Sequence, residues 1–112
     1  MTDKLLGALG LCRRAGALAA GFDVVCEAAQ GGKAELVLLA ADASERTRRK
    51  VTEACLGRCK LIETDITQQA LAGLLSKPTA VLAVTDKNLA ALCRKAAGVT
   101  EETKAQPQAQ PK

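Results

Sequence analysis

The sequence predicts an α/β fold of three layers, in which helices cover both faces of a small central sheet. Helical and extended patterns alternate along the chain. Two extended segments, residues 35–41 and 80–85, are almost continuously apolar, so each lacks the polar face that would meet water. Alternating helices and strands with strands of this kind are typical of an α/β/α sandwich.

The first half of the chain contains two helices and two extended segments. Leu5, Leu9 and Cys12 recur at helical spacing and indicate an N-terminal helix. Residues 18–20 are expected to form a short extended link or a brief strand. Gly21 then precedes a second helix over residues 22–30, which a Gly-Gly pair ends. The apolar strand over residues 35–41 follows.

The second half begins with a helix start at Asp42, because Glu45 lies three residues later in capping-box spacing. That helix is expected to run to Leu56. The remaining elements are a strand over residues 59–63, a helix over residues 67–75, a loop from Ser76 to Thr79, the strand over residues 80–85 and a last helix that Asp86 caps and that ends near Ala97.

Length and composition predict one folded domain over residues 1–98 of the 112 residues. Residues 99–112 hold Gln, Pro, Ala and Lys without apolar periodicity, and we expect a disordered tail there. No apolar run approaches the ~20 residues that span a bilayer, and no signal peptide is recognisable. We therefore expect a cytoplasmic protein without a membrane partner.

Catalytic and metal-binding patterns are missing from the sequence. It has five cysteines and no histidine, and no Cys-x-x-Cys pair of the kind that binds zinc. No phosphate loop, nucleophile elbow or dinucleotide fingerprint occurs. We expect buried, reduced thiols, no cofactor, no metal, no small-molecule substrate and no enzymatic activity.

Basic residues and one glycine are the candidate contacts for an anionic partner. Arg46, Arg49 and Lys50 share one helix face, which is either a solvated surface or a phosphate contact. The net charge of +4 is mild. Gly21 lets a backbone approach a ligand at a helix start, where free N–H groups bind phosphate or a base oxygen.

Lysines and arginines near other loops are expected to extend this surface. Arg13 and Arg14, Lys33 and Lys77 each lie beside a predicted loop, and we expect these loops to gather at one end of the sheet. Gly21, Lys33 and Lys77 should then form one contiguous positive surface.

Three segments of the chain carry a family resemblance. They are Leu5-Leu6-Gly7-Ala8-Leu9-Gly10-Leu11-Cys12-Arg13-Arg14-Ala15-Gly16, then Gly31-Gly32-Lys33-Ala34-Glu35-Leu36-Val37-Leu38-Leu39-Ala40-Ala41-Asp42-Ala43-Ser44, and Ala83-Val84-Thr85-Asp86. With Gly21 and the helix after it, they cover nearly the whole folded part. The chain resembles the kink-turn RNA-binding ribosomal-protein superfamily, particularly its small bacterial YlxQ-like members.

The resemblance implies an α/β/α sandwich around a mixed sheet and a non-catalytic, ribosome-associated protein that binds structured RNA, kink-turn-like or ribosomal. The start of the second helix would face tandem sheared G·A pairs, and the loop before the last strand would pack on bulged nucleotides. The implied RNA-binding residues are Gly21, Phe22, Asp23, Val24, Glu27, Lys33, Ser76, Lys77, Pro78 and Thr79.

The helix start departs from the family pattern at three positions. Asp23 stands where the ribosomal members have Asn, Val24 where they have Glu, and Glu27 where they have Lys. Ionised Asp only accepts hydrogen bonds, whereas Asn also donates. The alternative is therefore a protein-interaction module of the same fold that has lost kink-turn binding. The oligomeric state stays open.

Overall fold

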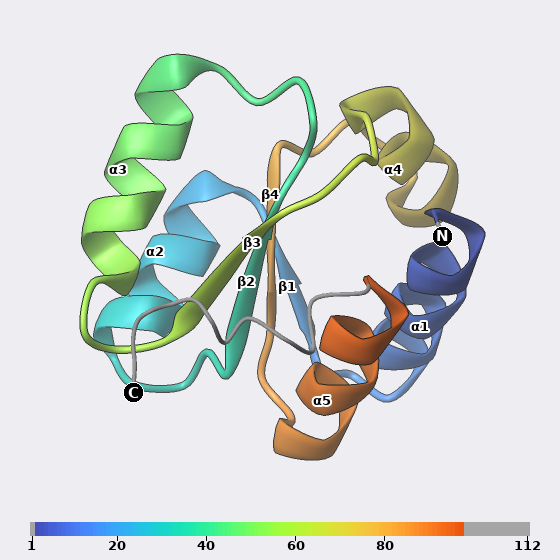
Figure 1. Ribbon diagram of the computed structural model, residues 1–112, viewed down its shortest axis with the longest axis horizontal. Helices are drawn as coiled ribbons and strands as arrows, with labels where there is room; N and C mark the ends of the chain where they lie inside the picture. Colours follow the sequence, from blue (N-terminus) through green and yellow to red (C-terminus); the bar gives the residue numbers. More distant parts are fainter. Residues whose placement is uncertain (1, 98–112) are drawn as a thin grey trace.

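The computed structural model describes residues 2–97, so the expected tail over residues 99–112 lies outside the described residues. Helices and strands alternate along the chain as predicted (Figure 1). The elements are α1 (Thr2–Arg14), β1 (Leu18–Ala20), α2 (Phe22–Gln30), β2 (Leu36–Leu39), α3 (Glu45–Cys55), β3 (Lys60–Glu63), α4 (Gln68–Leu75), β4 (Val81–Val84) and α5 (Lys87–Ala96).

The four strands form one mixed sheet in the order β1-β4-β2-β3. Strand β4 runs antiparallel to both of its neighbours, while β2 and β3 run parallel. Strands β1, β2 and β3 therefore all end where β4 begins. We call this edge the Gly21 end, because Gly21 follows β1 there, and the other edge the Lys33 end.

Helices cover both faces of the sheet, so the predicted three-layer sandwich is confirmed. Helices α2 and α3 pack on one face and α1, α4 and α5 on the other (Figure 1). The side chains of strand β2 alternate between the two cores. Leu36 and Leu38 face the core under α1, α4 and α5, while Val37 and Leu39 face the core under α2 and α3. All four residues are buried, as are the four of β4.

One predicted helix cap is wrong. Asp42 was expected to begin α3 with Glu45, but the N-cap is Ser44, whose hydroxyl accepts a hydrogen bond from the N–H of Thr47 at 3.1 Å. Asp42 instead binds the start of α4, where its carboxylate accepts from the N–H of Gln68. The capping-box spacing failed because hydrogen bonds to other segments hold the chain after Leu39 as a loop. The N–H of Ala40 donates to the carbonyl of Ala80, and the N–H of Ala41 donates to the carbonyl of Ile66.

No helix within residues 2–97 has both the length and the apolar character needed to cross a bilayer.

Candidate functional site

Four segments converge at the Gly21 end of the sheet. Helices α2, α3 and α4 all begin there, because each follows one of the three strands that end at this edge. The loop from Ser76 to Thr79 also lies there, since it leads into β4. This is the upper end of the sheet in Figure 1. Three helix N-termini thus direct their partial positive charge to one edge of the molecule.

Gly21 has a backbone conformation that other residues rarely adopt. Its φ is 107° and its ψ is 149°, a region that is essentially restricted to glycine. Its N–H donates to the carbonyl of Val81 at 3.2 Å, and its carbonyl accepts from Val25 at 3.0 Å. Gly21 therefore ends the pairing of β1 with β4 and begins α2 without an intervening loop.

The start of α2 lacks a side-chain cap. Within the described part of the chain, Ser44, Thr67 and Asp86 each cap their helix through a side-chain oxygen, whereas Gly21 has none to offer. The N–H groups of the first turn, from Phe22 to Val24, have no recorded hydrogen-bond partner among residues 2–97. They are free to bind an external acceptor.

The side chains of the α2 start face solvent. Phe22, Asp23, Val24 and Glu27 are all exposed, and Val24 reaches 49%. These positions are therefore accessible to a partner. The buried residues of the helix are Val25 and Ala29, which face the sheet.

The loop before β4 has an exposed tip and a buried base. Ser76, Lys77 and Pro78 are exposed, and Ser76 takes a left-handed conformation with φ 75°. Thr79 is 5% exposed, and its hydroxyl donates to the carbonyl of Lys77 at 3.3 Å. Of the four predicted loop contacts, Thr79 thus supports the loop, while the other three can meet a ligand.

The expectation that Lys33 lies with Gly21 and Lys77 is wrong. Lys33 follows α2, and nine helical residues extend about 13.5 Å back along the sheet to the Lys33 end. Arg13 and Arg14 also lie at that end, because they precede β1. The predicted length of this helix could have shown the error, because a helix that runs back along a sheet places the residues before and after it at opposite ends of the sheet.

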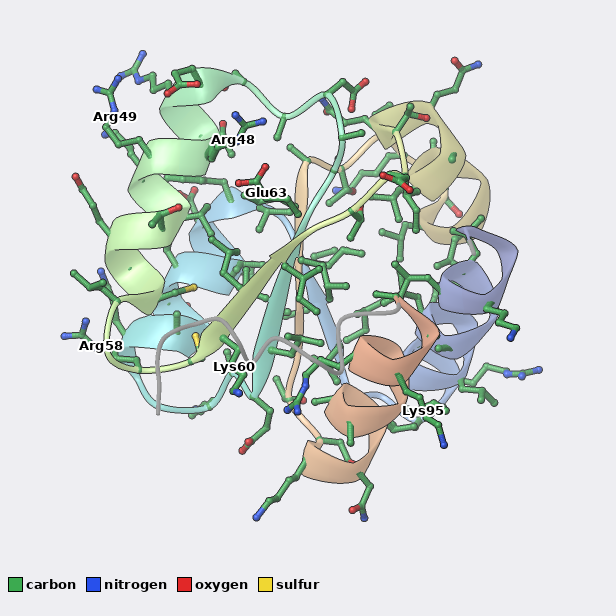
Figure 2. All side chains as sticks on the ribbon, in the orientation of Figure 1. Arg48, Arg49, Arg58, Lys60, Glu63 and Lys95 are labelled. Carbon is green, nitrogen blue, oxygen red and sulfur yellow. The ribbon has the colours of Figure 1, made fainter. Side chains whose placement is uncertain are left out.

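Basic residues of α3 take the place expected for Lys33. Arg46, Thr47 and Lys50 line a hollow of about 260 Å³ together with Phe22, at the start of α2. Figure 2 shows Arg48 and Arg49 near the start of α3, with Arg58 and Lys60 toward the opposite end. The shared helix face of Arg46, Arg49 and Lys50 was the sequence signal for this group.

Arg48 differs from these neighbours because carboxylates hold it. Its guanidinium lies 3.6 Å from Glu45 and 3.7 Å from Glu63, which places it over β3 (Figure 2). No other ion pair is recorded within residues 2–97. Arg46 and Lys50 are exposed cations without a carboxylate partner in that range.

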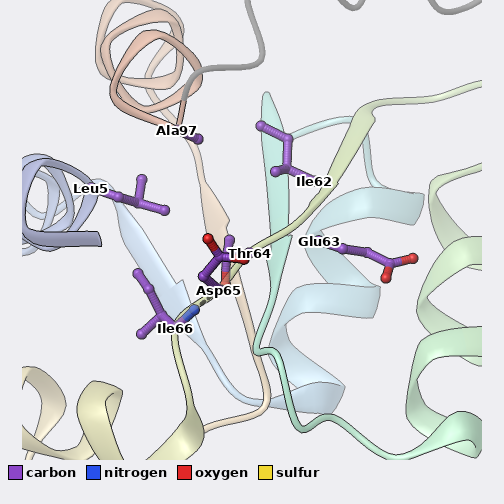
Figure 3. Close-up of a pocket in the computed structure, with 7 residues that line it drawn as sticks. All are labelled: Leu5, Ile62, Glu63, Thr64, Asp65, Ile66 and Ala97. Atoms are coloured by element: carbon purple, nitrogen blue, oxygen red, sulfur yellow. Dashed lines mark hydrogen bonds between the residues drawn. The ribbon is translucent and has the colours of Figure 1, made fainter. Parts of the chain in front are cut away.

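A small cavity between β3, α1 and α5 does not form a substrate site. It measures about 90 Å³, which is room for about three water molecules at ~30 Å³ each. In Figure 3 the carboxylate of Glu63 points away from the other lining residues. The Thr64 hydroxyl donates to the carbonyl of Leu39 at 2.8 Å and accepts from the N–H of Ile66 at 3.2 Å, so it holds the turn after β3.

The cysteines are free thiols, of which three are buried. Cys12 and Cys93 are fully buried with their sulfur atoms 3.6 Å apart, and Cys55 is 3% exposed. Burial raises the pKa of the Cys93 and Cys55 thiols to about 12. Cys26 and Cys59 are only half-buried, in contrast to the expectation for all five. No group of three potential ligands among residues 2–97 could hold a metal ion.

Comparisons with known proteins agree with this architecture. The family described as "Ribosomal protein L7Ae/L30e/S12e/Gadd45 family" matches residues 3–103. The "RNA-binding protein YlxQ" of Bacillus subtilis (strain 168) is 36% identical over 84 residues, which are 73% of this chain and 83% of the relative.

Two solved structures share the fold. A protein of unknown function from Bacillus halodurans C superposes with a TM-score of 0.74 at 29% identity, over 88% of this chain and 98% of that one. The 15.5kD RNA binding protein of Giardia lamblia superposes with a TM-score of 0.68 over 89% of this chain and 87% of that one. Its 21% identity shows the fold alone.

Proposed function

Because the chain belongs to the ribosomal protein L7Ae/L30e/S12e/Gadd45 family, we propose that it is a non-catalytic RNA-binding protein that binds RNA at the Gly21 end of its sheet. The family resemblance stated from the sequence is confirmed by this match and by the YlxQ relative, whose name is that of an RNA-binding protein. The free thiols fit a reducing, cytoplasmic setting, which is part of the proposal.

The uncapped start of α2 carries this proposal. The free N–H groups of residues 22–24 and the helix dipole would bind a phosphate or base oxygen. Because Gly21 has no side chain, the backbone itself can approach the RNA. This observation favours the α2 start over the starts of α3 and α4, where the side chains of Ser44 and Thr67 each already accept a hydrogen bond from one N–H group.

Two flanking features would add phosphate contacts. Lys77 stands exposed on the loop before β4, and Arg46 and Lys50 stand exposed on α3. The hydrogen bond from Gly21 to Val81 places the α2 start beside the strand that this loop enters. The proposed contact surface therefore comprises Gly21 with the α2 start, the loop tip Ser76–Pro78, and these two cations of α3.

The RNA is proposed to be structured, either a kink-turn-like or a ribosomal element. Asp23 would accept but not donate a hydrogen bond at a base edge, and Glu27 would repel a phosphate where the ribosomal members have Lys. We therefore expect shape and phosphate contacts to provide most of the affinity. Discrimination in favour of a kink-turn should be weaker than in the ribosomal members.

Filter binding tests this function with a kink-turn RNA, a plain duplex of equal length and a ribosomal RNA fragment, each at several salt concentrations. We expect affinity that falls as salt rises, because bound phosphates release counterions. Lys77→Gln should lower the slope of log affinity against log salt by about one. Lys33→Gln is the matched control, since that lysine lies at the opposite end of the sheet and should leave the slope unchanged.

Salt-independent or absent binding to all three RNAs would overturn the proposal. The second candidate would then be a protein-interaction module of the same fold, which the exposed Val24 at the α2 start favours. A pull-down with and without nuclease separates the two, because a protein partner survives nuclease whereas an RNA-bridged one does not.

A further inference from the structure

Phe22 is the only aromatic residue of the chain, and it lies at the surface rather than in the core. Its side chain is 37% exposed in the first turn of α2, directly after Gly21. An aromatic ring contributes most to stability when it is buried. Phe22 lies at the α2 start, within the proposed contact surface, so its ring is accessible to a bound partner.

The ring forms one wall of the hollow between α2 and α3. The other walls are Arg46, Thr47 and Lys50, and the volume is about 260 Å³. A second hollow of about 340 Å³ continues along the two helices and shares Phe22 and Lys50. Glu53 lines this second hollow, whereas no carboxylate lines the first.

The two cations of the first hollow are available to an anion. Arg46 and Lys50 lie one helical turn apart on α3, so their side chains project from the same face. Both are exposed, and neither makes an ion pair within residues 2–97. Arg48, between them in sequence, is instead held by Glu45 and Glu63.

We propose that the hollow lined by Phe22, Arg46, Thr47 and Lys50 binds one unpaired nucleotide of the RNA. The base stacks on the Phe22 ring, and the adjacent phosphate binds Arg46 and Lys50. A nucleotide carries a flat base and, next to it, a negatively charged phosphate. The hollow presents partners for both, since an aromatic ring lies beside two cations. The Thr47 hydroxyl can donate to either part. This inference rests on the proposed function.

This subsite differs from the contact assigned to the loop before β4. It lies on the side of α2 that faces α3, between two helices of the same layer. Lys77 and its loop instead lead into β4. An RNA bound across the Gly21 end would thus place one nucleotide in the hollow, while the folded part of the RNA contacts the backbone at Gly21.

The test is a double-mutant cycle with the full chain and the kink-turn RNA. Each unpaired nucleotide is replaced in turn by an abasic residue, and Phe22→Leu removes the ring while it keeps an apolar side chain. We expect one abasic position and Phe22→Leu each to weaken binding by about tenfold. Combined, they should weaken it little further, since both remove the same stacking contact. Leu92→Ala is the matched control, because Leu92 is similarly exposed at 39% but lies on α5, which packs on the other face of the sheet, and it lines neither hollow.

A second variant tests the phosphate half of the subsite. Lys50→Gln should lower the salt slope by about one, with thermal melts to verify that both variants fold. Unchanged affinity in Phe22→Leu, or fully additive losses at every abasic position, would overturn the nucleotide subsite. If Phe22→Leu is neutral while Lys77→Gln still weakens binding, only this inference fails. If the wild-type protein binds none of the RNAs, the proposed function fails together with this inference.

Discussion

The carboxylate of Asp42 accepts a hydrogen bond from the backbone N–H of Gln68 at 2.9 Å, and the Asp42 backbone carbonyl accepts a second one from the Gln68 side-chain amide at 3.2 Å. These two bonds, both donated by Gln68, join the loop after β2 to the first residue of α4, 26 residues later in the chain. It holds two of the segments that meet at the Gly21 end.

Asp42→Ala should lower the free energy of unfolding by about 1 kcal/mol, as loss of a helix-start acceptor typically does. Urea denaturation measures the change. Glu35→Ala is the control, because Glu35 is an exposed carboxylate whose side chain has no recorded hydrogen bond among the described residues. Equal effects of the two substitutions would show that the Asp42–Gln68 bond adds nothing to stability.

Gly21→Ala should destabilise the fold by about 1–3 kcal/mol through backbone strain alone. A Cβ built on Gly21 meets no atom within 4 Å, so steric overlap is not the cause. Gly7→Ala provides the comparison, since Gly7 lies in α1 with the same open surroundings and an ordinary φ. That substitution should stabilise the protein by up to about 1 kcal/mol.

Calorimetric melts of the two glycine variants therefore move in opposite directions. A stabilised Gly21→Ala would mean that the α2 start can relax to an ordinary conformation, and the role of the glycine there would need another explanation.

Leu38→Ala should cost about 2–5 kcal/mol, because the side chain is 2% exposed in the middle of the sheet. Leu56→Ala removes the same atoms from a side chain that is 74% exposed and should change stability by less than about 0.5 kcal/mol. Chemical denaturation of both variants measures the difference. Similar losses at the two sites would contradict the placement of β2 between two helical layers.

Stability should fall as pH rises above about 9. Burial raises the pKa of the Cys55 and Cys93 thiols from 9.0 to about 12, so the folded state holds these protons more tightly than the unfolded state. Their contribution is fully present below the unfolded pKa of 9.0 and is lost as pH approaches 12. Urea denaturation across this window measures the decline.

Cys93→Ala should make that decline shallower, whatever its effect on stability at neutral pH. An unchanged slope would mean that other groups cause the loss.

Thiol labelling at neutral pH measures how accessible each cysteine is. The half-buried Cys26 and Cys59 should react before the three buried cysteines.

The sequence located the helices and strands because their signals are local. Gly21 and the Gly31–Gly32 pair fix the bounds of α2 at residues 22–30, and the apolar runs of β2 and β4 required cover on both faces. The mixed sheet came from the family resemblance, since strand direction is not encoded in a single segment. The order β1-β4-β2-β3 became visible only in the structure.

The candidate site was predicted in part for the same reason. Gly21 and the exposed start of α2 follow from adjacent residues in the chain, and the sequence alone determined them. Only the tertiary structure decided that Asp42 serves α4 instead of α3 and that Arg46 and Lys50 stand beside Phe22. These relationships depend on which segments the sheet brings together, and packing between distant segments is set by the whole fold rather than by any local pattern.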